Sequence, residues 1–154
     1  TPRGGAERRE SLEDLYRVTR GEGFGADVKR RILLGTFVLS AGYADRYYRK
    51  AAAARHAIAQ DFARVFETVD VLVCPAAPEL PFRLGEKVQD PLTMYASDAL
   101  TVPVNVAGLP ALSVPCGDVR GLPVGLQIIA AQGREDLMVR VGAAYERARG
   151  PWSP

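Results

Sequence analysis

The segment of residues 90–129, DPLTMYASDALTVPVNVAGLPALSVPCGDVRGLPVGLQII, decides the fold of this chain. It begins with a stretch that favours a helix over residues 91–100, in which Asp98 is the one charged residue. A turn with prolines follows, and two apolar stretches, residues 111–116 and 123–130, predict strands that residues 117–121 connect. A carboxylate beside a buried strand layer needs a polar partner, because an unpaired buried charge is expensive. We therefore expect Asp98 to be a structural hydrogen-bond anchor or a receptor for a cationic group of a ligand.

Three helices and a strand are expected before this segment, and one helix after it. Ser11-Leu12-Glu13-Asp14 resembles a capping box and predicts a short helix that ends before Gly21. A second helix begins near Ala26, a third covers residues 44–68, and the last covers residues 134–147. Residues 70–75 predict a buried strand, and residues 75–89 predict a surface loop. This order of helices and strands indicates an α/β or α+β protein with few strands.

The third and last helices have the clearest apolar patterns. In the third helix, apolar residues at steps of three and four predict one buried stripe, formed by Tyr47, Ala51, Ala54, Ile58, Phe62, Val65 and Val69. In the last helix one face is expected to pack inward through Leu137, Val141, Ala144, Tyr145 and Ala148.

Length and composition are those of an ordinary soluble chain. The 154 residues suffice for one compact domain, with 47% hydrophobic and 25% charged residues. We expect a loose lead-in over residues 1–10 and a tail over residues 150–154. A net charge of +2 does not favour nucleic acid or an anionic membrane as a partner, and no apolar run approaches the ~18 residues of a membrane span. The start lacks both a signal peptide and Met, which hints at a fragment.

The cysteines and the histidine do not indicate a metal or catalytic centre. Cys74 and Cys116 lack metal-binding spacing, and we expect two buried reduced thiols of a cytoplasmic protein. The one histidine, His56, lies on the long helix, where a solvated or packed side chain is expected. No serine stands in a glycine-rich nucleophile elbow, and no phosphate loop or dinucleotide fingerprint is present. We therefore expect no catalytic residue in this chain.

Recognition of a small ligand is the more specific hypothesis. Arg30 or Arg31 could bind a carboxylate with two parallel hydrogen bonds, which suits the planar guanidinium. Asp98 could accept hydrogen bonds from an ammonium group, and together the two charges would hold both ends of a free amino acid. The alternative is that Arg31 and Asp98 are surface residues or form a salt bridge with each other.

Two long stretches resemble a known family. GFGADVKRRILLGTFVLSAGYADRYYRKA at residues 23–51 and DPLTMYASDALTVPVNVAGLPALSVPCG at residues 90–117 are similar to the C-terminal part of amidase-signature enzymes. Within that family they resemble most the A subunits of glutamyl-tRNA(Gln) amidotransferases, and LPVGLQII at residues 122–129 continues the likeness. The resemblance covers about residues 11–147.

This resemblance implies a fold, a reaction and partners. Residues 11–149 would be the C-terminal part of an amidase domain, an α/β fold with a mixed sheet covered by helices. Enzymes of this kind hydrolyse glutamine to glutamate and ammonia. The B subunit then uses the ammonia, with ATP and Mg, to convert Glu-tRNA(Gln) to Gln-tRNA(Gln), and the C subunit stabilises the pair. The Ser–Ser–Lys triad lies in the N-terminal portion of the family, so this chain alone is expected to be inactive.

The resemblance also implies roles for two residues. Arg31, the second arginine of KRR, resembles the residue that binds the substrate α-carboxylate, and Asp98 of YASDAL resembles the acid that binds the α-ammonium group. Ala44-Asp45-Arg46 departs from the usual Tyr-Asp-Ala, which puts partner contacts there in doubt. Two alternatives stay open: a fragment of another amidase-signature amide hydrolase, or a non-catalytic binding or scaffold domain.

Overall fold

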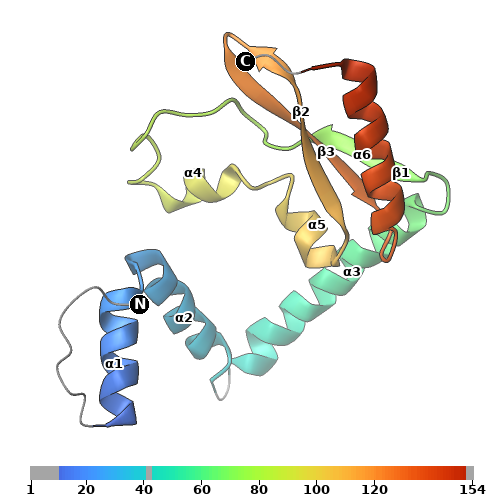
Figure 1. The fold of residues 1–154 in the computed structure, drawn as a ribbon. Coiled ribbons are helices and arrows are strands. Elements are labelled where there is room, and N and C mark those ends of the chain that lie inside the picture. The colour runs from blue at the N-terminus through green and yellow to red at the C-terminus, as the bar shows by residue number, and fades with distance from the viewer. Residues whose placement is uncertain (1–10, 41–42, 152–154) are drawn as a thin grey trace. The chain divides into compact units, whose positions relative to one another are not determined.

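The computed structural model describes residues 11–40 and 43–151 (Figure 1). The chain divides into two compact units, Thr1–Ala52 and Ala53–Pro154. The predicted lead-in over residues 1–10 and the last three residues of the predicted tail lie outside the described residues.

The first unit contains the helices α1, Leu12–Gly23, and α2, Ala26–Val38. Ser11 caps α1 as predicted, because its side chain accepts a hydrogen bond of 3.1 Å from the backbone N–H of Asp14. The helix continues to Gly23, beyond the end predicted before Gly21. A short π-helix, Ala44–Tyr48, follows where the start of the third helix was predicted.

Helix α3, Arg49–Val65, does not have the buried stripe that its sequence predicts. Ile58 and Phe62 are half-buried, and no residue of the helix is fully buried. An amphipathic face is buried only where another element covers it. The helix does contact the later helix α5, Val102–Ala107, through a polar group: Arg55 Nε donates a 3.0 Å hydrogen bond to the carbonyl oxygen of Val106.

The second unit is built on a three-stranded sheet with the order β1-β3-β2. The strands are β1, Val71–Pro75, β2, Ala111–Val119, and β3, Leu122–Ala130. Both pairings are antiparallel, so this chain's described strands form an antiparallel sheet. The central position of β3 makes its C-terminal half the most buried part of the unit, as the consecutive buried residues 127–130 indicate.

The connection between β2 and β3 is shorter than the sequence suggested. The predicted five-residue connection over residues 117–121 is wrong, because the strands extend to Val119 and from Leu122 and leave a two-residue turn. Arg120 and Gly121 have φ angles of 56° and 74°, the positive values of a tight hairpin turn that follows the twist of the strands. A bulge between Pro115 and Gly117 adjusts the pairing before the turn.

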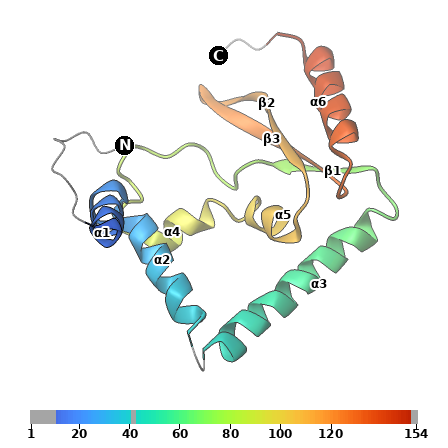
Figure 2. The same ribbon diagram turned by 60° about the horizontal axis from the view of Figure 1, so that its bottom comes forward.

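Helix α6, Glu135–Arg149, packs against β2 and β3 (Figure 2). Among the described residues, four buried ones form the core cluster next to this helix, namely Val114, Ile128, Ala130 and Met138. Val141 and Tyr145 pack against this core as predicted, whereas Ala144 and Ala148 are exposed. The inward face lies about one position from the predicted one, because Gly142 lets the helix approach Leu112 closely: a Cβ at residue 142 would lie 2.5 Å from Leu112 Cδ2.

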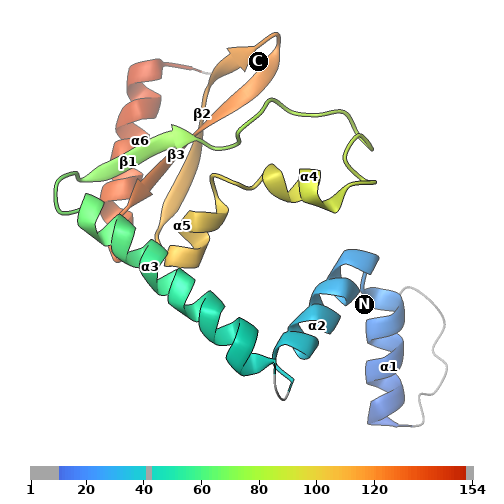
Figure 3. The ribbon, with the colours of Figure 1, turned by 180° about the vertical axis from the view of Figure 1, so that it is seen from behind.

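The helix predicted over residues 91–100 is wrong in its second half. Helix α4, Pro91–Ala96, ends early, residues 97–100 form a turn, and a second helix, α5, Val102–Ala107, follows (Figure 3). The side chain of Asp90 caps α4 by accepting a 2.9 Å hydrogen bond from the N–H of Leu92. Pro103 lies in the first turn of α5, where a helix tolerates proline, and so begins a helix in a segment that was expected to be a turn.

The loop between β1 and α4 is anchored by a buried lysine. Lys87 is 7% exposed, and its Nζ donates hydrogen bonds to the Glu79 carboxylate and, at 2.9 Å, to Ser97 Oγ. The same Nζ lies 4.4 Å from the centre of the Phe82 ring, a cation–π contact. The hydrogen bond from Lys87 is the main cause that lowers the pKa of the Glu79 carboxyl group below its ordinary value. A segment that the sequence presents as a surface loop thus has an internal ionic anchor.

Replacement of Ile128, which is 1% exposed, tests the core. Ile128→Ala should lower the free energy of unfolding by about 2–5 kcal/mol, because it removes buried methyl groups and leaves a cavity. Urea unfolding followed by circular dichroism measures the change. The matched control is Val139→Ala on α6, where the residue is 55% exposed and the change should stay within about 0.5 kcal/mol. Equal losses in both variants would contradict the assigned core.

The ion pair between Lys87 and Glu79 can be tested by titration of the Glu79 carboxyl group. Glu79 should titrate below its ordinary pKa of 4.5, and Lys87→Met should raise that pKa toward 4.5. Because the folded state has the lower pKa, the pair stabilises the fold above pH 4.5, and this contribution is lost as the pH falls through the lowered value. Carbon-13 NMR of the Glu79 carboxyl group measures the titration, with Lys50→Met as the control. An unchanged Glu79 titration in Lys87→Met would refute the ion pair.

Candidate functional site

Asp98 lies in the turn between α4 and α5 and is exposed. Two hydrogen bonds hold the backbone of Asp98. Its N–H donates a 3.1 Å hydrogen bond to the Tyr95 carbonyl oxygen, and its carbonyl oxygen accepts a 2.9 Å hydrogen bond from the N–H of Val102. Within residues 11–40 and 43–151, no hydrogen bond or ion pair reaches the carboxylate itself. Of the two predicted uses of this acid, the structural anchor therefore has no support in the described structure.

The turn that contains Asp98 is fixed from both sides by buried polar side chains. At its start, Lys87 Nζ donates to Ser97 Oγ at 2.9 Å. At its end, Gln127 Nε2 donates a 3.1 Å hydrogen bond to the carbonyl oxygen of Leu100. Gln127 is 5% exposed and stands on the central strand β3, in the most buried part of the sheet. An exposed carboxylate on a turn held this firmly can accept hydrogen bonds from an ammonium group without first becoming ordered.

Arg31 lies on α2, in the first unit, and its side chain is 63% exposed. Its Nε donates a 2.8 Å hydrogen bond to Asp27 Oδ2, and Arg30 pairs with the other oxygen of Asp27. The hydrogen bond from Arg31 is the main cause that lowers the pKa of the Asp27 carboxyl group. Asp27 therefore balances the basic start of α2. Because Arg31 and Asp98 belong to different units, their predicted common pocket stays a prediction.

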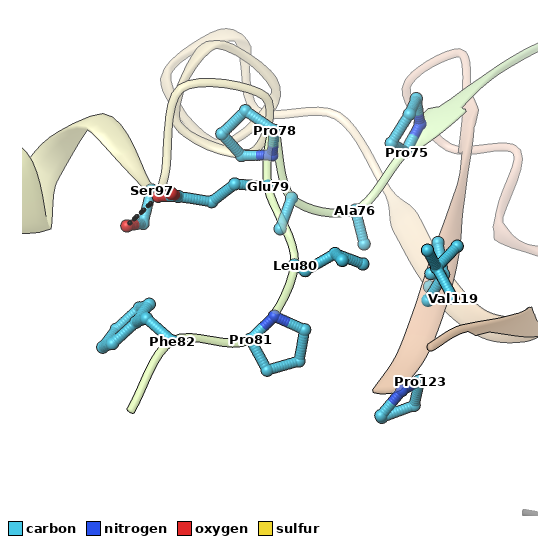
Figure 4. Close-up of a pocket in the computed structure, with 13 residues that line it drawn as sticks. Pro75, Ala76, Pro78, Glu79, Leu80, Pro81, Phe82, Ser97, Val119 and Pro123 are labelled. Atoms are coloured by element: carbon cyan, nitrogen blue, oxygen red, sulfur yellow. Dashed lines mark hydrogen bonds between the residues drawn. The ribbon is translucent and has the colours of Figure 1, made fainter. Parts of the chain in front are cut away.

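An apolar cavity of about 410 Å³ lies beside the turn that contains Asp98 (Figure 4). It is bounded by residues 75–82, by Ser97 and by the β2–β3 hairpin. Prolines supply much of its wall, and Figure 4 shows Glu79 and Ser97 together at one side, where Ser97 Oγ donates a 3.2 Å hydrogen bond to Glu79. The sequence did not indicate this cavity, because a proline-rich loop has no periodicity that would predict which of its side chains face inward.

Ser97 does not have the surroundings of a nucleophile, although Lys87 is its neighbour. Lys87 donates to both Ser97 and Glu79, and a lysine engaged in this way acts as a hydrogen-bond donor, whereas a serine nucleophile needs a base. His56 is an exposed residue of α3, as predicted for a solvated histidine. Cys74 and Cys116 are free and half-buried.

Two other kinds of site have no support in the described residues. No group of three or more His, Cys, Asp or Glu side chains there is arranged to hold a metal ion. No helix in the same part of the chain has both the length and the apolar character needed to cross a membrane.

Comparisons with known proteins give the family. The model of the family described as Amidase matches residues 3–139. The A subunit of glutamyl-tRNA(Gln) amidotransferase from Geobacillus stearothermophilus is 59% identical over 138 residues, which are 90% of this chain and 28% of that protein. The protein of the same name from a Cyanothece strain is 58% identical over 93% of this chain and 30% of its own length. The chain thus spans less than a third of these relatives.

Solved structures agree with this assignment. The A subunit of glutamyl-tRNA(Gln) amidotransferase from Thermotoga maritima is 41% identical, with a TM-score of 0.61 over 83% of this chain and 28% of that chain. A structure described as an amidase is 27% identical, with a TM-score of 0.67 over 93% of this chain and 33% of that one. These matches confirm the predicted fold class as part of the amidase-signature fold, and the chain belongs to the amidase family.

Proposed function

We propose that the chain is the C-terminal part of the A subunit of a glutamyl-tRNA(Gln) amidotransferase and that it supplies the residues that recognise glutamine. The observation that supports this most strongly is the 59% identity to such a protein over 90% of the chain. In this proposal the full-length A subunit hydrolyses glutamine to glutamate and ammonia in the cytoplasm. The ammonia passes to the B subunit, which holds ATP and Mg and amidates Glu-tRNA(Gln), and the C subunit stabilises the complex.

Glutamine recognition would use one charge at each end of the amino acid backbone. Asp98 accepts hydrogen bonds from the α-ammonium group, a role supported by its exposed carboxylate and its well-held turn. Arg31 binds the α-carboxylate, and Asp27 orients its guanidinium through Nε. Two charge-assisted contacts of opposite sign distinguish a free amino acid from an amide that lacks either group.

The chemical step would take place on residues outside this chain. Acyl transfer needs an activated nucleophile, a base and donors for the oxyanion. We assign none of these roles to a described residue, because Ser97 and Lys87 form a structural anchor and His56 is an exposed helix residue. The chain alone is therefore expected to hydrolyse no amide.

A second candidate is another amide hydrolase of the same family. The amidase structure has a higher TM-score, 0.67, than the Thermotoga maritima protein, at 0.61. A structure described as 6-aminohexanoate cyclic dimer hydrolase also matches, with a TM-score of 0.65 at 25% identity. A third candidate is a non-catalytic binding or scaffold domain with the same fold. The substrate preference of the full-length protein separates these candidates.

Substitution of the two charged residues tests the proposed recognition. Arg31→Ala and Asp98→Asn, each made in the full-length protein, should weaken glutamine binding by about 2–4 kcal/mol, because each leaves one charged group of the ligand without its partner. Steady-state glutaminase assays give the KM for glutamine. Arg64→Ala and Asp61→Asn are matched controls from an exposed ion pair on α3 and should leave KM unchanged. Normal glutamine dependence in either site variant would disprove that residue's role.

The choice of substrate tests the proposed reaction. The full-length protein, assembled with the B and C subunits, should hydrolyse glutamine in strong preference to aliphatic amides such as propionamide, which lack both charged groups. Release of ammonia measures both rates. A preference for the aliphatic amide would favour the second candidate, and no hydrolysis of either amide would favour a binding or scaffold domain.

A further inference from the structure

Two polar or charged residues, Lys87 and Gln127, are buried in the part of the chain that the structure describes. They come from different elements, a loop and the central strand, and are 7% and 5% exposed. Both donate hydrogen bonds to the same short turn, Lys87 to Ser97 Oγ at 2.9 Å and Gln127 to the Leu100 carbonyl oxygen at 3.1 Å. The two contact points lie on either side of Asp98 in the sequence.

Burial of these groups is costly unless their hydrogen-bonding capacity is used. An ammonium group and an amide lose their hydration in the interior, and the loss is offset only by well-placed partners. Lys87 has three such partners in Glu79, Ser97 and the Phe82 ring. Gln127 donates to Leu100 and, at 3.2 Å, to Cys74 Sγ. An apolar side chain would fill either place without this cost, so hydrophobic packing alone does not explain the choice of residues.

The side chain of Asp98, which lies between the two contact points, takes no part in either hydrogen bond. The Asp98 carboxylate is exposed, and within the described ranges no side chain or backbone group bonds to it. Its position is therefore set by its backbone and by the neighbours that hold the turn. Contacts at Ser97 and Leu100, together with the backbone hydrogen bonds of Asp98 to Tyr95 and Val102, limit the backbone of this turn and so set the direction of the Cα–Cβ bond of Asp98.

We propose that Lys87 and Gln127 are positioning residues that together hold the turn at residues 97–100 and so direct the Asp98 carboxylate toward the α-ammonium group of the substrate. This inference rests on the proposed function, since it assumes that Asp98 binds that group. Neither residue touches the substrate in this arrangement. Each acts through one end of the turn, and the two supports are independent because one comes from the loop before α4 and the other from β3.

The test compares variants of the full-length protein in its complex. Lys87→Met and Gln127→Met keep the size and burial of each side chain but remove the donor. Each should raise the KM for glutamine by about tenfold or more while kcat changes less, as expected when a binding group is displaced. Glutaramate, which is glutamine without its α-amino group, is the second probe, and its kcat/KM should stay unchanged. Lys50→Met and Gln60→Met replace exposed residues of α3 and serve as matched controls.

Combination with Asp98→Asn distinguishes positioning from general loosening of the site. In the Asp98→Asn protein, Lys87→Met and Gln127→Met should not raise the KM for glutamine further, because the carboxylate that Lys87 and Gln127 position is already removed. Additive losses, or equal losses for glutaramate, would overturn the inference. If Lys87→Met does not fold, Ser97→Ala removes the same contact by deleting one hydroxyl. Lys87→Arg keeps a donor at this position and should therefore retain part of the affinity for glutamine. An Asp98→Asn protein with normal glutamine dependence would instead refute the proposed function.

Discussion

The structure of the second unit depends on the hydrogen bonds that two buried polar side chains make. Lys87 and Gln127 lose water on burial, and both recover hydrogen bonds from the turn between α4 and α5. The apolar core under α6 holds β2 and β3 together, but it does not reach this turn. The polar contacts therefore decide where the turn lies relative to the sheet. They also decide the position of Asp98, the acid that the turn exposes to solvent.

Much of the fold could be predicted from local patterns. Short apolar stretches located the three strands of the described structure, and Ser11 located the first helix, because both signals act within a few residues. The errors came from features that depend on distant partners or on unusual backbone. Both turn residues, Arg120 and Gly121, were expected in a longer loop, although their positive φ angles close a tight hairpin. The stripe on α3 was predicted as buried from periodicity, which cannot indicate whether a covering surface is present.

The candidate site was predicted only at the level of its charged groups. Asp98 stood out because its segment is otherwise uncharged, and Arg31 because a planar guanidinium suits a carboxylate. Lys87 could not be recognised, since a lysine in a loop with glycine and proline normally indicates a solvated side chain. Gln127 did leave a signal: it is the one amide in the apolar strand β3, and a polar group in such a place requires a partner. That partner, the carbonyl oxygen of Leu100, could come only from the three-dimensional structure.

A structure of the full-length protein with glutamine bound would test the proposed recognition most directly. We expect the α-ammonium nitrogen to lie about 3 Å from an oxygen of Asp98 and the α-carboxylate to accept two hydrogen bonds of similar length from Arg31. We also expect Lys87 and Gln127 to stay bonded to Ser97 and Leu100 without touching the ligand. Glutamine bound elsewhere, with Arg31 and Asp98 on separate surfaces, would contradict this mode of recognition.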